Sequence, residues 1–289
     1  WLAELADRRA KRGSVVLHRR NPATAAMRQA TRTHTPPWRA AVSMFTIIPV
    51  GGPETIGPDL ARRITYWLPA IGALLAVPAA GILLGVEAVD SVPRRLLAAT
   101  LAVAVLGLLT GGLHLDGLAD TADGLASRTP AGQALDIMRR SDTGPIGVAT
   151  LVFVALVQVT ALAAMTPRWE SAAALITAVV TGRVAVLAAS GAPAARVGGF
   201  GALIAGTTSR ETRWIGCAVL LVVVGASAWA ADDLALAVRG LVAVACGLVV
   251  AAAVRWLACR RLGGMTGDVY GALIETSTAT VLLVAALSG

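Results

Sequence analysis

The sequence contains few charged residues, few aromatic residues and few cysteines. Of its 289 residues, 15% are charged, 4% are aromatic and 56% are hydrophobic. Soluble domains carry about 25% charged residues, so this composition excludes a soluble globular enzyme, a disordered chain and a nucleic-acid-binding domain. What is present is a series of long uncharged runs separated by short charged clusters, which is typical of a polytopic membrane protein.

The three cysteines do not form a metal or redox motif. Cys217, Cys246 and Cys259 form no CxxC pair, have no histidine at ligand spacing and lie in or beside apolar runs. Cysteines in such positions pack as small apolar residues. We therefore predict that they fill space between helices.

Most of the net positive charge lies at the N-terminus. Residues 1–40 carry a net charge of +7 out of +8 for the whole chain, and they show no signal-peptide pattern. We predict that residues 1–37 form a flexible basic extension near anionic lipid. Residues 38–289 are predicted to form a single transmembrane catalytic domain.

Seven uncharged runs are long enough to cross a membrane. A hydrocarbon core about 30 Å thick needs about 20 apolar residues per helix. The shorter run Ala40–Val50 ends in proline and glycine and is predicted to be interfacial or re-entrant. The expected fold is therefore an all-α membrane helix bundle of about seven transmembrane helices plus this short segment. The runs are residues 64–86, 96–115, 143–166, 171–192, 214–231, 234–254 and 270–288.

The distribution of arginine predicts the orientation of these spans. The connections 116–142, 193–213 and 255–269 are rich in arginine, whereas the loops on the other side mix arginine with acids. Basic loops face the cytoplasm, so these connections and the N-terminus are expected inside and the C-terminus outside. We predict a multi-pass protein of the cytoplasmic (inner) membrane with its active site on the cytoplasmic face.

Three aspartates follow the second span at helical spacing. Asp116, Asp120 and Asp123 lie at positions i, i+4 and i+7 of the segment Thr110–Leu125, so a helix places them on one face. Their mutual repulsion and desolvation require a positive partner. Carboxylate oxygens suit Mg²⁺, which is commonly shared with substrate phosphates. The alternative, a solvated acidic loop, does not explain three acids in register beside an apolar run.

Glycines and one histidine accompany these acids. Gly111, Gly112, Gly117 and Gly124 are expected to let a diphosphate approach the backbone. His114 is a candidate general base, although a hydrogen bond to a neighbouring aspartate is the preferred interpretation.

A second cluster occupies Gly263–Glu275. Asp268 is predicted to lie in a glycine-rich turn, and Glu275 lies seven residues later inside the last span. An acid inside a membrane helix indicates a functional site. The alternative for Glu275 is a salt bridge to Arg183, the one charge in the fourth predicted span.

A third stretch, Met138–Gly147, combines two arginines with a turn of small residues. Arg139 and Arg140 can hold phosphate oxygens through forked, charge-assisted hydrogen bonds. Arg140 is equally explained as a positive-inside residue without a ligand. The turn residues predicted to contact the substrate phosphate are Ser141, Asp142 and Gly144.

Together these segments predict a Mg²⁺-dependent enzyme that acts on a phosphate-bearing substrate at the membrane surface. Carboxylates with Mg²⁺, and without a nucleophilic cysteine or serine motif, suit direct phosphoryl transfer.

At three segments the sequence resembles the cobalamin synthase (adenosylcobinamide-GDP ribazoletransferase) family. They are FTIIPV at 45–50, TGGLHLDGLADTADGL at 110–125 and GGMTGDVYGALIE at 263–275, and the resemblance runs from about residue 39 to the C-terminus. It implies a multi-pass enzyme that joins α-ribazole or its 5′-phosphate to adenosylcobinamide-GDP with Mg²⁺. The products are GMP and adenosylcobalamin or its 5′-phosphate.

The resemblance implies roles for individual residues. The 5′-oxygen of α-ribazole would attack the phosphorus attached to cobinamide. Arg139 and Arg183 would offset phosphate charge, and Asp123 would accept the proton of the attacking hydroxyl. Relatives tend to read IMKDSRxG where this chain reads IMRRSDTG at 137–144, so acid and base are exchanged around Ser141. The residues assigned to the metal shell are Asp116, Asp120, Asp123, Asp268 and Glu275.

Two other functions remain open at this point. A CDP-alcohol phosphotransferase also presents aspartates to Mg²⁺, and its motif begins D-G-x-x-A-R. Here Asp116-Gly117 is followed by Leu118-Ala119-Asp120, and no Ala-Arg pair follows in register. A transporter would use the acids as an ion pathway, yet such acids lie near the bilayer midplane. The expected partners are the two substrates and the lipid bilayer, without nucleic acid, and a homo-oligomer remains open.

Overall fold

The structure is a computed structural model that describes residues 35–85 and 91–289. Residues Pro36–Gly289 form one compact unit, whereas the predicted basic extension lies almost entirely outside the described residues. Within the described ranges the chain is helical, apart from an isolated β-bridge between Ala194 and Met265. The prediction of an all-α fold is therefore confirmed.

Within the described residues, seven helices are long and apolar enough to cross a membrane. Each matches one of the seven runs read from the sequence, so the protein is a multi-pass membrane protein. These helices are α5 (Leu68–Gly85), α6 (Val92–Leu109), α9 (Pro145–Ala164), α10 (Arg168–Ala189), α12 (Arg210–Ala231), α13 (Leu234–Leu262) and α14 (Gly267–Ser288).

In the part of the chain that the structure describes, five shorter helices connect or precede the long ones. The segment predicted as interfacial or re-entrant begins as a helix whose buried face includes Ala41 and Phe45. The short helices are α3 (Pro37–Phe45), α4 (Pro58–Thr65), α7 (Leu113–Ala126), α8 (Ala131–Ile137) and α11 (Gly199–Ile204).

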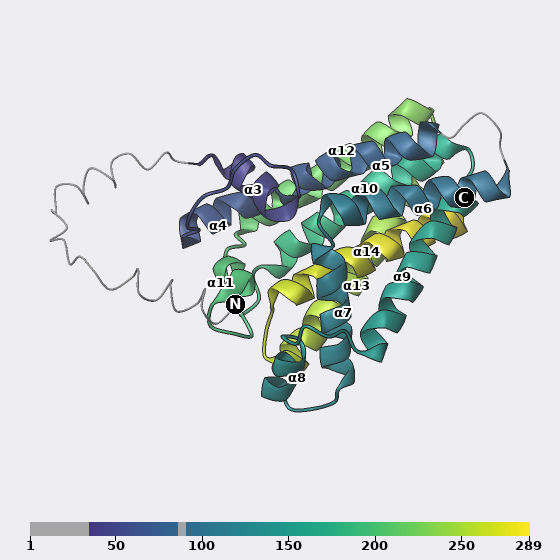
Figure 1. Ribbon diagram of the computed structural model, residues 1–289. Coiled ribbons are helices and arrows are strands. Elements are labelled where there is room, and N and C mark those ends of the chain that lie inside the picture. Colours follow the sequence, from purple (N-terminus) through teal and green to yellow (C-terminus); the bar gives the residue numbers. More distant parts are fainter. Residues whose placement is uncertain (1–34, 86–90) are drawn as a thin grey trace, which may run out of the picture. The chain divides into compact units, whose positions relative to one another are not determined.

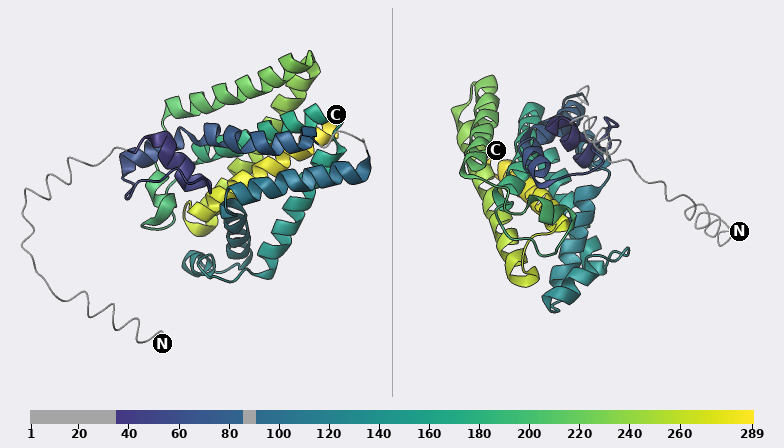
Figure 2. Two further views of the ribbon diagram at one scale, coloured as in Figure 1. Left: turned by 45° about the horizontal axis from the view of Figure 1, so that its top comes forward. Right: turned by 90° about the vertical axis from the view of Figure 1, so that its left-hand side faces the viewer.

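Helices α10 and α14 form the centre of the bundle (Figure 1). In α10, 78% of the most apolar stretch is buried, compared with 17% in α6. Helix α10 packs against α5, α12, α13 and α14, and α14 also packs against α7 and α9. Helices α12 and α13 pack against each other, and the right view of Figure 2 shows them on one flank of the bundle.

The long helices alternate in direction along the chain, so loops gather at two ends. One end collects α7, α8 and α11 together with the connection from α13 to α14. Gly289 lies at the other end, where it approaches Glu170 and Arg239. All segments with predicted chemistry therefore lie at a single end.

For one of the predicted spans, the position of its C-terminal end is wrong. The run 96–115 was expected to be a single helix, but α6 stops at Leu109. Gly111 and Gly112 follow with φ of +61° and +75°, a conformation that side chains with a Cβ disfavour. The chain turns there, and α7 starts as a separate helix of 14 residues, which is too short to span a bilayer.

Candidate active site

Two glycines bring α7 and α14 into backbone contact. A Cβ atom on Gly117 would lie 2.7 Å from the carbonyl oxygen of Asp268, and one on Gly271 would lie 3.0 Å from the carbonyl oxygen of His114. Only glycine permits so close an approach. Gly117 is thus buried against protein, and Gly124 likewise faces Met138, so the prediction that these two glycines admit a diphosphate is wrong.

This contact places Asp268 beside the acids of α7, and we call Asp116, Asp120 and Asp268 the aspartate group. Asp268 lies in the first turn of α14 rather than in a turn before the helix. Burial, together with the charges of Asp116, Asp268 and Asp123, raises the pKa of Asp120 to about 6. The carboxylates repel one another, so a cation here would relieve an unfavourable interaction.

An arginine that the sequence analysis did not select adjoins this group. Nη2 of Arg196 lies 3.2 Å from Oδ2 of Asp268, and the Thr266 hydroxyl donates to the same oxygen at 3.1 Å. Arg196 lies in the loop before α11, far from Asp268 in sequence. No spacing signal connects the two residues, and only the fold brings them together.

The aspartate group has a donor set that fits Mg²⁺. Among the described residues, no three His, Cys, Asp or Glu side chains converge closely enough to hold a metal by themselves. Mg²⁺ typically takes one or two carboxylates and completes its octahedral shell with water and substrate phosphates. Asp116 and Asp268, with Asp120 one turn along α7, meet that requirement.

Asp123 has a structural task that the sequence analysis did not foresee. Its Oδ2 accepts the backbone N–H of Gly144 at 2.7 Å and its Oδ1 accepts that of Gly147 at 2.8 Å. These N–H groups belong to the first turn of α9, so Asp123 acts as a cap at the positive end of that helix. Gly144, predicted to contact phosphate, is the N-cap residue directly before α9.

Four helices contribute to a polar cluster buried behind the aspartate group. Nδ1 of His114 lies 3.4 Å from Nη2 of Arg183 and 4.0 Å from Oε1 of Glu275. Gln158 donates to Oε2 of Glu275 at 3.0 Å. Glu275 therefore approaches His114 rather than forming a direct pair with Arg183, and His114 contacts these residues rather than a neighbouring aspartate.

The protonation of His114 follows from its surroundings. Burial lowers its pKa well below the ordinary value, and the positive charge of Arg183 lowers it further. Because a guanidinium can only donate, Nδ1 of the neutral ring is the acceptor and the ring proton lies on Nε2. His114 is thus a neutral side chain with one N–H to offer.

Two adjoining cavities open at this end of the bundle. The first, the aromatic cavity, has a volume of about 370 Å³ and is lined by Phe45, Phe200, Tyr270 and several aliphatic side chains, with His114 and Arg196. The second, the threonine cavity, has a volume of about 600 Å³ and is lined by Thr46, Thr110, Thr143 and neighbouring residues. Three residues line both cavities, namely Met44, Leu113 and Asp116.

Of the other residues predicted to contact phosphate, some line the threonine cavity and the rest line neither cavity. Gly111 and Gly112 line the threonine cavity. In the described structure Arg183 and Glu275 line neither cavity. The same is true of a group of exposed residues in the turn before α9, namely Arg139, Arg140, Ser141 and Asp142.

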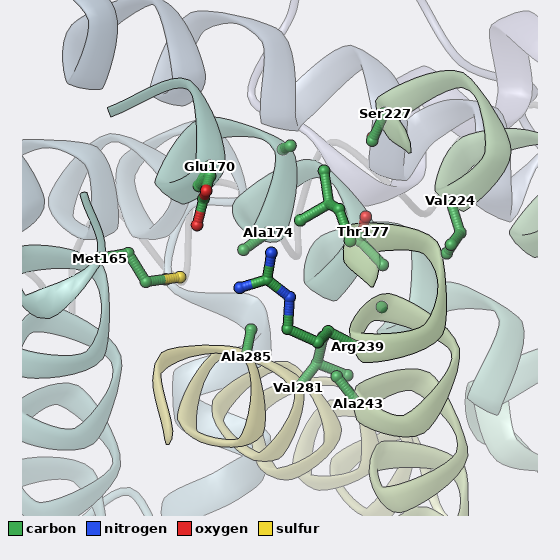
Figure 3. Close-up of a pocket in the computed structure, with 13 residues that line it drawn as sticks. Met165, Glu170, Ala174, Thr177, Val224, Ser227, Arg239, Ala243, Val281 and Ala285 are labelled. Atoms are coloured by element: carbon green, nitrogen blue, oxygen red, sulfur yellow. The ribbon is translucent and has the colours of Figure 1, made fainter. Parts of the chain in front are cut away.

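A third cavity lies at the opposite end of the bundle. Figure 3 shows the Arg239 guanidinium pointing toward Met165, Ala174 and Glu170. The volume of about 40 Å³ holds water but no nucleotide. The chemistry therefore belongs to the end that carries the aspartate group.

Comparison with known proteins agrees with this geometry. The profile of the cobalamin-5-phosphate synthase family matches residues 37–286. The chain belongs to this family. It is therefore an enzyme, as predicted, and the match includes every helix that builds the aspartate group and the two cavities.

Relatives of this cobalamin-5-phosphate synthase family member are similar over most of their length. A protein from Frankia casuarinae is 38% identical over 263 residues, which cover 86% of this chain and 94% of the relative. One from Nocardioides sp. is 36% identical over 248 residues, which cover 85% of this chain and 96% of that relative. Both are named adenosylcobinamide-GDP ribazoletransferase. No solved structure matches the chain.

Proposed function

We propose that the chain transfers the cobinamide phosphate of adenosylcobinamide-GDP to α-ribazole or α-ribazole 5′-phosphate and releases GMP, with Mg²⁺ as cofactor. The observation that carries this proposal is Asp116, a carboxylate that lines two adjoining cavities. A reaction that joins two large substrates needs two binding spaces with a shared reacting centre. The names of the relatives agree with these substrates.

The aspartate group would hold the metal ion at that centre. Bound there, Mg²⁺ would neutralise the diphosphate and the charge that develops on it during transfer. Asp116 and Asp268 line the aromatic cavity and Asp116 also faces the threonine cavity. Glu275 and Asp123, which were predicted to join the metal shell, are not among the described residues that line the two cavities, so we leave them out of the proposed metal site.

The transfer is a single displacement at phosphorus. A ribose hydroxyl of the ribazole attacks the phosphorus attached to cobinamide, and the bond to the GMP oxygen breaks. Because a 5′-phosphate survives in the phosphorylated product, we propose a secondary hydroxyl as the attacking group in place of the 5′-oxygen expected from the sequence. Its proton passes to a carboxylate of the aspartate group, two of which line the cavity beside the reacting centre.

The buried polar cluster would position His114. Arg183 and Glu275 hold the ring from two other helices, so its Nε2–H keeps one direction. A donor at a cavity wall can stabilise a phosphate oxygen. Arg183 thus acts through His114, whereas it was predicted to contact phosphate itself.

We further propose that the protein lies in the inner membrane with this site on the cytoplasmic side. The arginine-rich connections around residues 116–142, 193–213 and 255–269 support this orientation. Nucleotide-activated substrates are made in the cytoplasm, so the site would then meet them directly.

Nucleotide release tests the proposed reaction. Purified protein in detergent receives adenosylcobinamide-GDP and α-ribazole with Mg²⁺, and chromatography with mass spectrometry follows GMP and the joined corrinoid. We expect both products in equal amounts and neither when EDTA is present. Release of CMP from CDP-diacylglycerol would instead support a CDP-alcohol phosphotransferase. Uptake into proteoliposomes without nucleotide turnover would support a transporter.

A further inference from the structure

We infer that the aromatic cavity is the binding site for the ribazole, with its heterocyclic ring against Phe200. The threonine cavity then takes the diphosphate end of adenosylcobinamide-GDP. This assignment rests on the proposed function and deepens it, because it says which substrate occupies which space.

The aromatic side chains of the cavity are arranged to receive a flat ring. The Phe200 ring meets Phe45 edge-on at a centroid distance of 5.4 Å and meets Tyr270 edge-on at 6.4 Å. Phe45 and Tyr270 are buried, whereas Phe200 is half-exposed. Two neighbours therefore fix the Phe200 ring, and its remaining surface is available to a ligand.

The polar groups of the cavity are few, and three of them bond to one another. Arg196, Asp268 and Thr266 form this set, the other polar side chains are His114, Asp116 and Tyr270, and the remaining lining is apolar or glycine. Guanine has donors and acceptors around its ring that would lose water with few replacements. A dimethylbenzimidazole ring has one free acceptor nitrogen and two methyl groups, so an apolar aromatic space suits it better.

The size and position of the cavity agree with a nucleoside. Its volume of about 370 Å³ falls within the range of roughly 300–1,000 Å³ found for small-molecule sites. Because Asp116 lines this cavity and the next, a ribose placed here has its hydroxyls beside the carboxylate that faces the diphosphate. The larger cavity opens beside Gly111 and Gly112, where backbone is accessible.

Arg196 allows the aromatic cavity to recognise the 5′-phosphate of the ribazole. Among the described residues that line the two cavities, Arg196 is the one side chain with a permanent positive charge. A phosphate on the ribazole would therefore bind at Arg196, beside Asp268. The cavity accepts both forms of the nucleoside and favours the phosphorylated one.

Steady-state kinetics test the assignment of the ring. Phe200→Leu removes the aromatic face, and we expect the KM for α-ribazole to rise about three- to tenfold while the KM for adenosylcobinamide-GDP stays unchanged. Phe200→Tyr keeps the ring and is expected to restore the normal KM. Phe153→Leu, at an exposed position of α9, is the matched control and should change neither KM. A rise in the KM for adenosylcobinamide-GDP instead would overturn the assignment, because guanine would then occupy the cavity.

The ratio of two substrates tests Arg196. In Arg196→Gln, the preference in kcat/KM for α-ribazole 5′-phosphate over α-ribazole is expected to fall about tenfold or more, because charged hydrogen bonds are lost. If the substitution only disturbs Asp268, kcat/KM falls by the same factor for both substrates and their ratio stays unchanged. An unchanged ratio would overturn the role of Arg196.

Hydrogen exchange of the wild-type protein tests the cavity without any substitution. With α-ribazole as the probe and no second substrate, we expect protection of residues 199–204 in α11. Protection confined to residues 110–112 would overturn the assignment. Absence of GMP release by the wild type overturns the proposed function, whereas normal release with an unchanged KM in Phe200→Leu overturns only the assignment of the cavity.

Discussion

Asp116 is the side chain on which the proposed reaction depends most directly. It lines both cavities, and we expect Asp116→Asn to lower Mg²⁺-dependent GMP release by about a hundredfold or more, the size seen when charge stabilisation is lost at a reacting centre. The initial rate of GMP formation measures this. Asp136→Asn, at an exposed position of α8, is the control and should keep the normal rate. Near-normal turnover of Asp116→Asn would remove this residue from the metal site.

Asp120 allows the electrostatic argument to be tested without turnover. Burial and three neighbouring carboxylates raise its pKa, so its charge is unfavourable when no cation is bound. In EDTA, Asp120→Asn should therefore melt at a higher temperature than the wild type. Adding Mg²⁺ should raise the melting temperature of the wild type more than that of the variant. A lower melting temperature for Asp120→Asn in EDTA would contradict the repulsion.

The sequence predicted the acids of this site better than their partners. Asp116 and Asp120 share a helical face, and Asp268 lies in a glycine-rich motif, so spacing and composition identify them. Arg196 and Gln158 are single polar residues in a loop and in a span, and they acquire partners only when α9, α11 and α14 meet. Tertiary contacts of this kind leave no periodic pattern in a sequence.

At the scale of the helix, the start of α9 depends on a side chain of α7. Asp123 accepts two backbone N–H groups of α9, so Asp123→Asn should lower the free energy of unfolding by about 1–2 kcal/mol. Thermal melting in detergent measures the loss. Asp142→Asn, at an exposed position near the same helix end, is the control. A larger loss of turnover in Asp123→Asn than in Asp116→Asn would restore the predicted catalytic role of Asp123.

The contact of α7 with α14 should tolerate no side chain at Gly117. A methyl group there would press on the backbone of Asp268, so Gly117→Ala should separate the aspartate group and lower turnover at least about tenfold. Gly225→Ala on α12, where nothing lies within 4 Å of the added atom, should leave turnover unchanged. Initial rates of GMP release compare the two variants. Equal rates would mean that α7 and α14 can move apart without lowering turnover.

The boundaries of the helices show what hydropathy leaves out. The run 96–115 looks continuous on an apolar scale, yet two glycines with positive φ divide it after Leu109. Hydropathy measures transfer into lipid and contains no backbone conformation. The presence of seven spans was therefore predictable, but the separate, non-spanning helix that carries Asp116 was not.

For the whole molecule, the positive-inside rule predicts the side on which each end lies. In a cysteine-free background, Ser288→Cys at the C-terminal end should react with a membrane-impermeant maleimide in intact spheroplasts. Ser141→Cys should react only after the membrane is permeabilised. Both serines are exposed, so access and not burial decides the result. The reverse pattern would invert the orientation and place the aspartate group outside.

The shared wall formed by Asp116 restricts how such a chain can diversify. A substitution of Asp116 alters the aromatic cavity and the threonine cavity together. It therefore cannot change the preference for one heterocyclic base without also affecting the other substrate. Substitutions at Phe45 or in α11 reshape the aromatic cavity alone and leave the metal-facing acids untouched. Family members that accept different heterocycles should therefore differ around the counterparts of Phe45 and Phe200 while keeping the same aspartates.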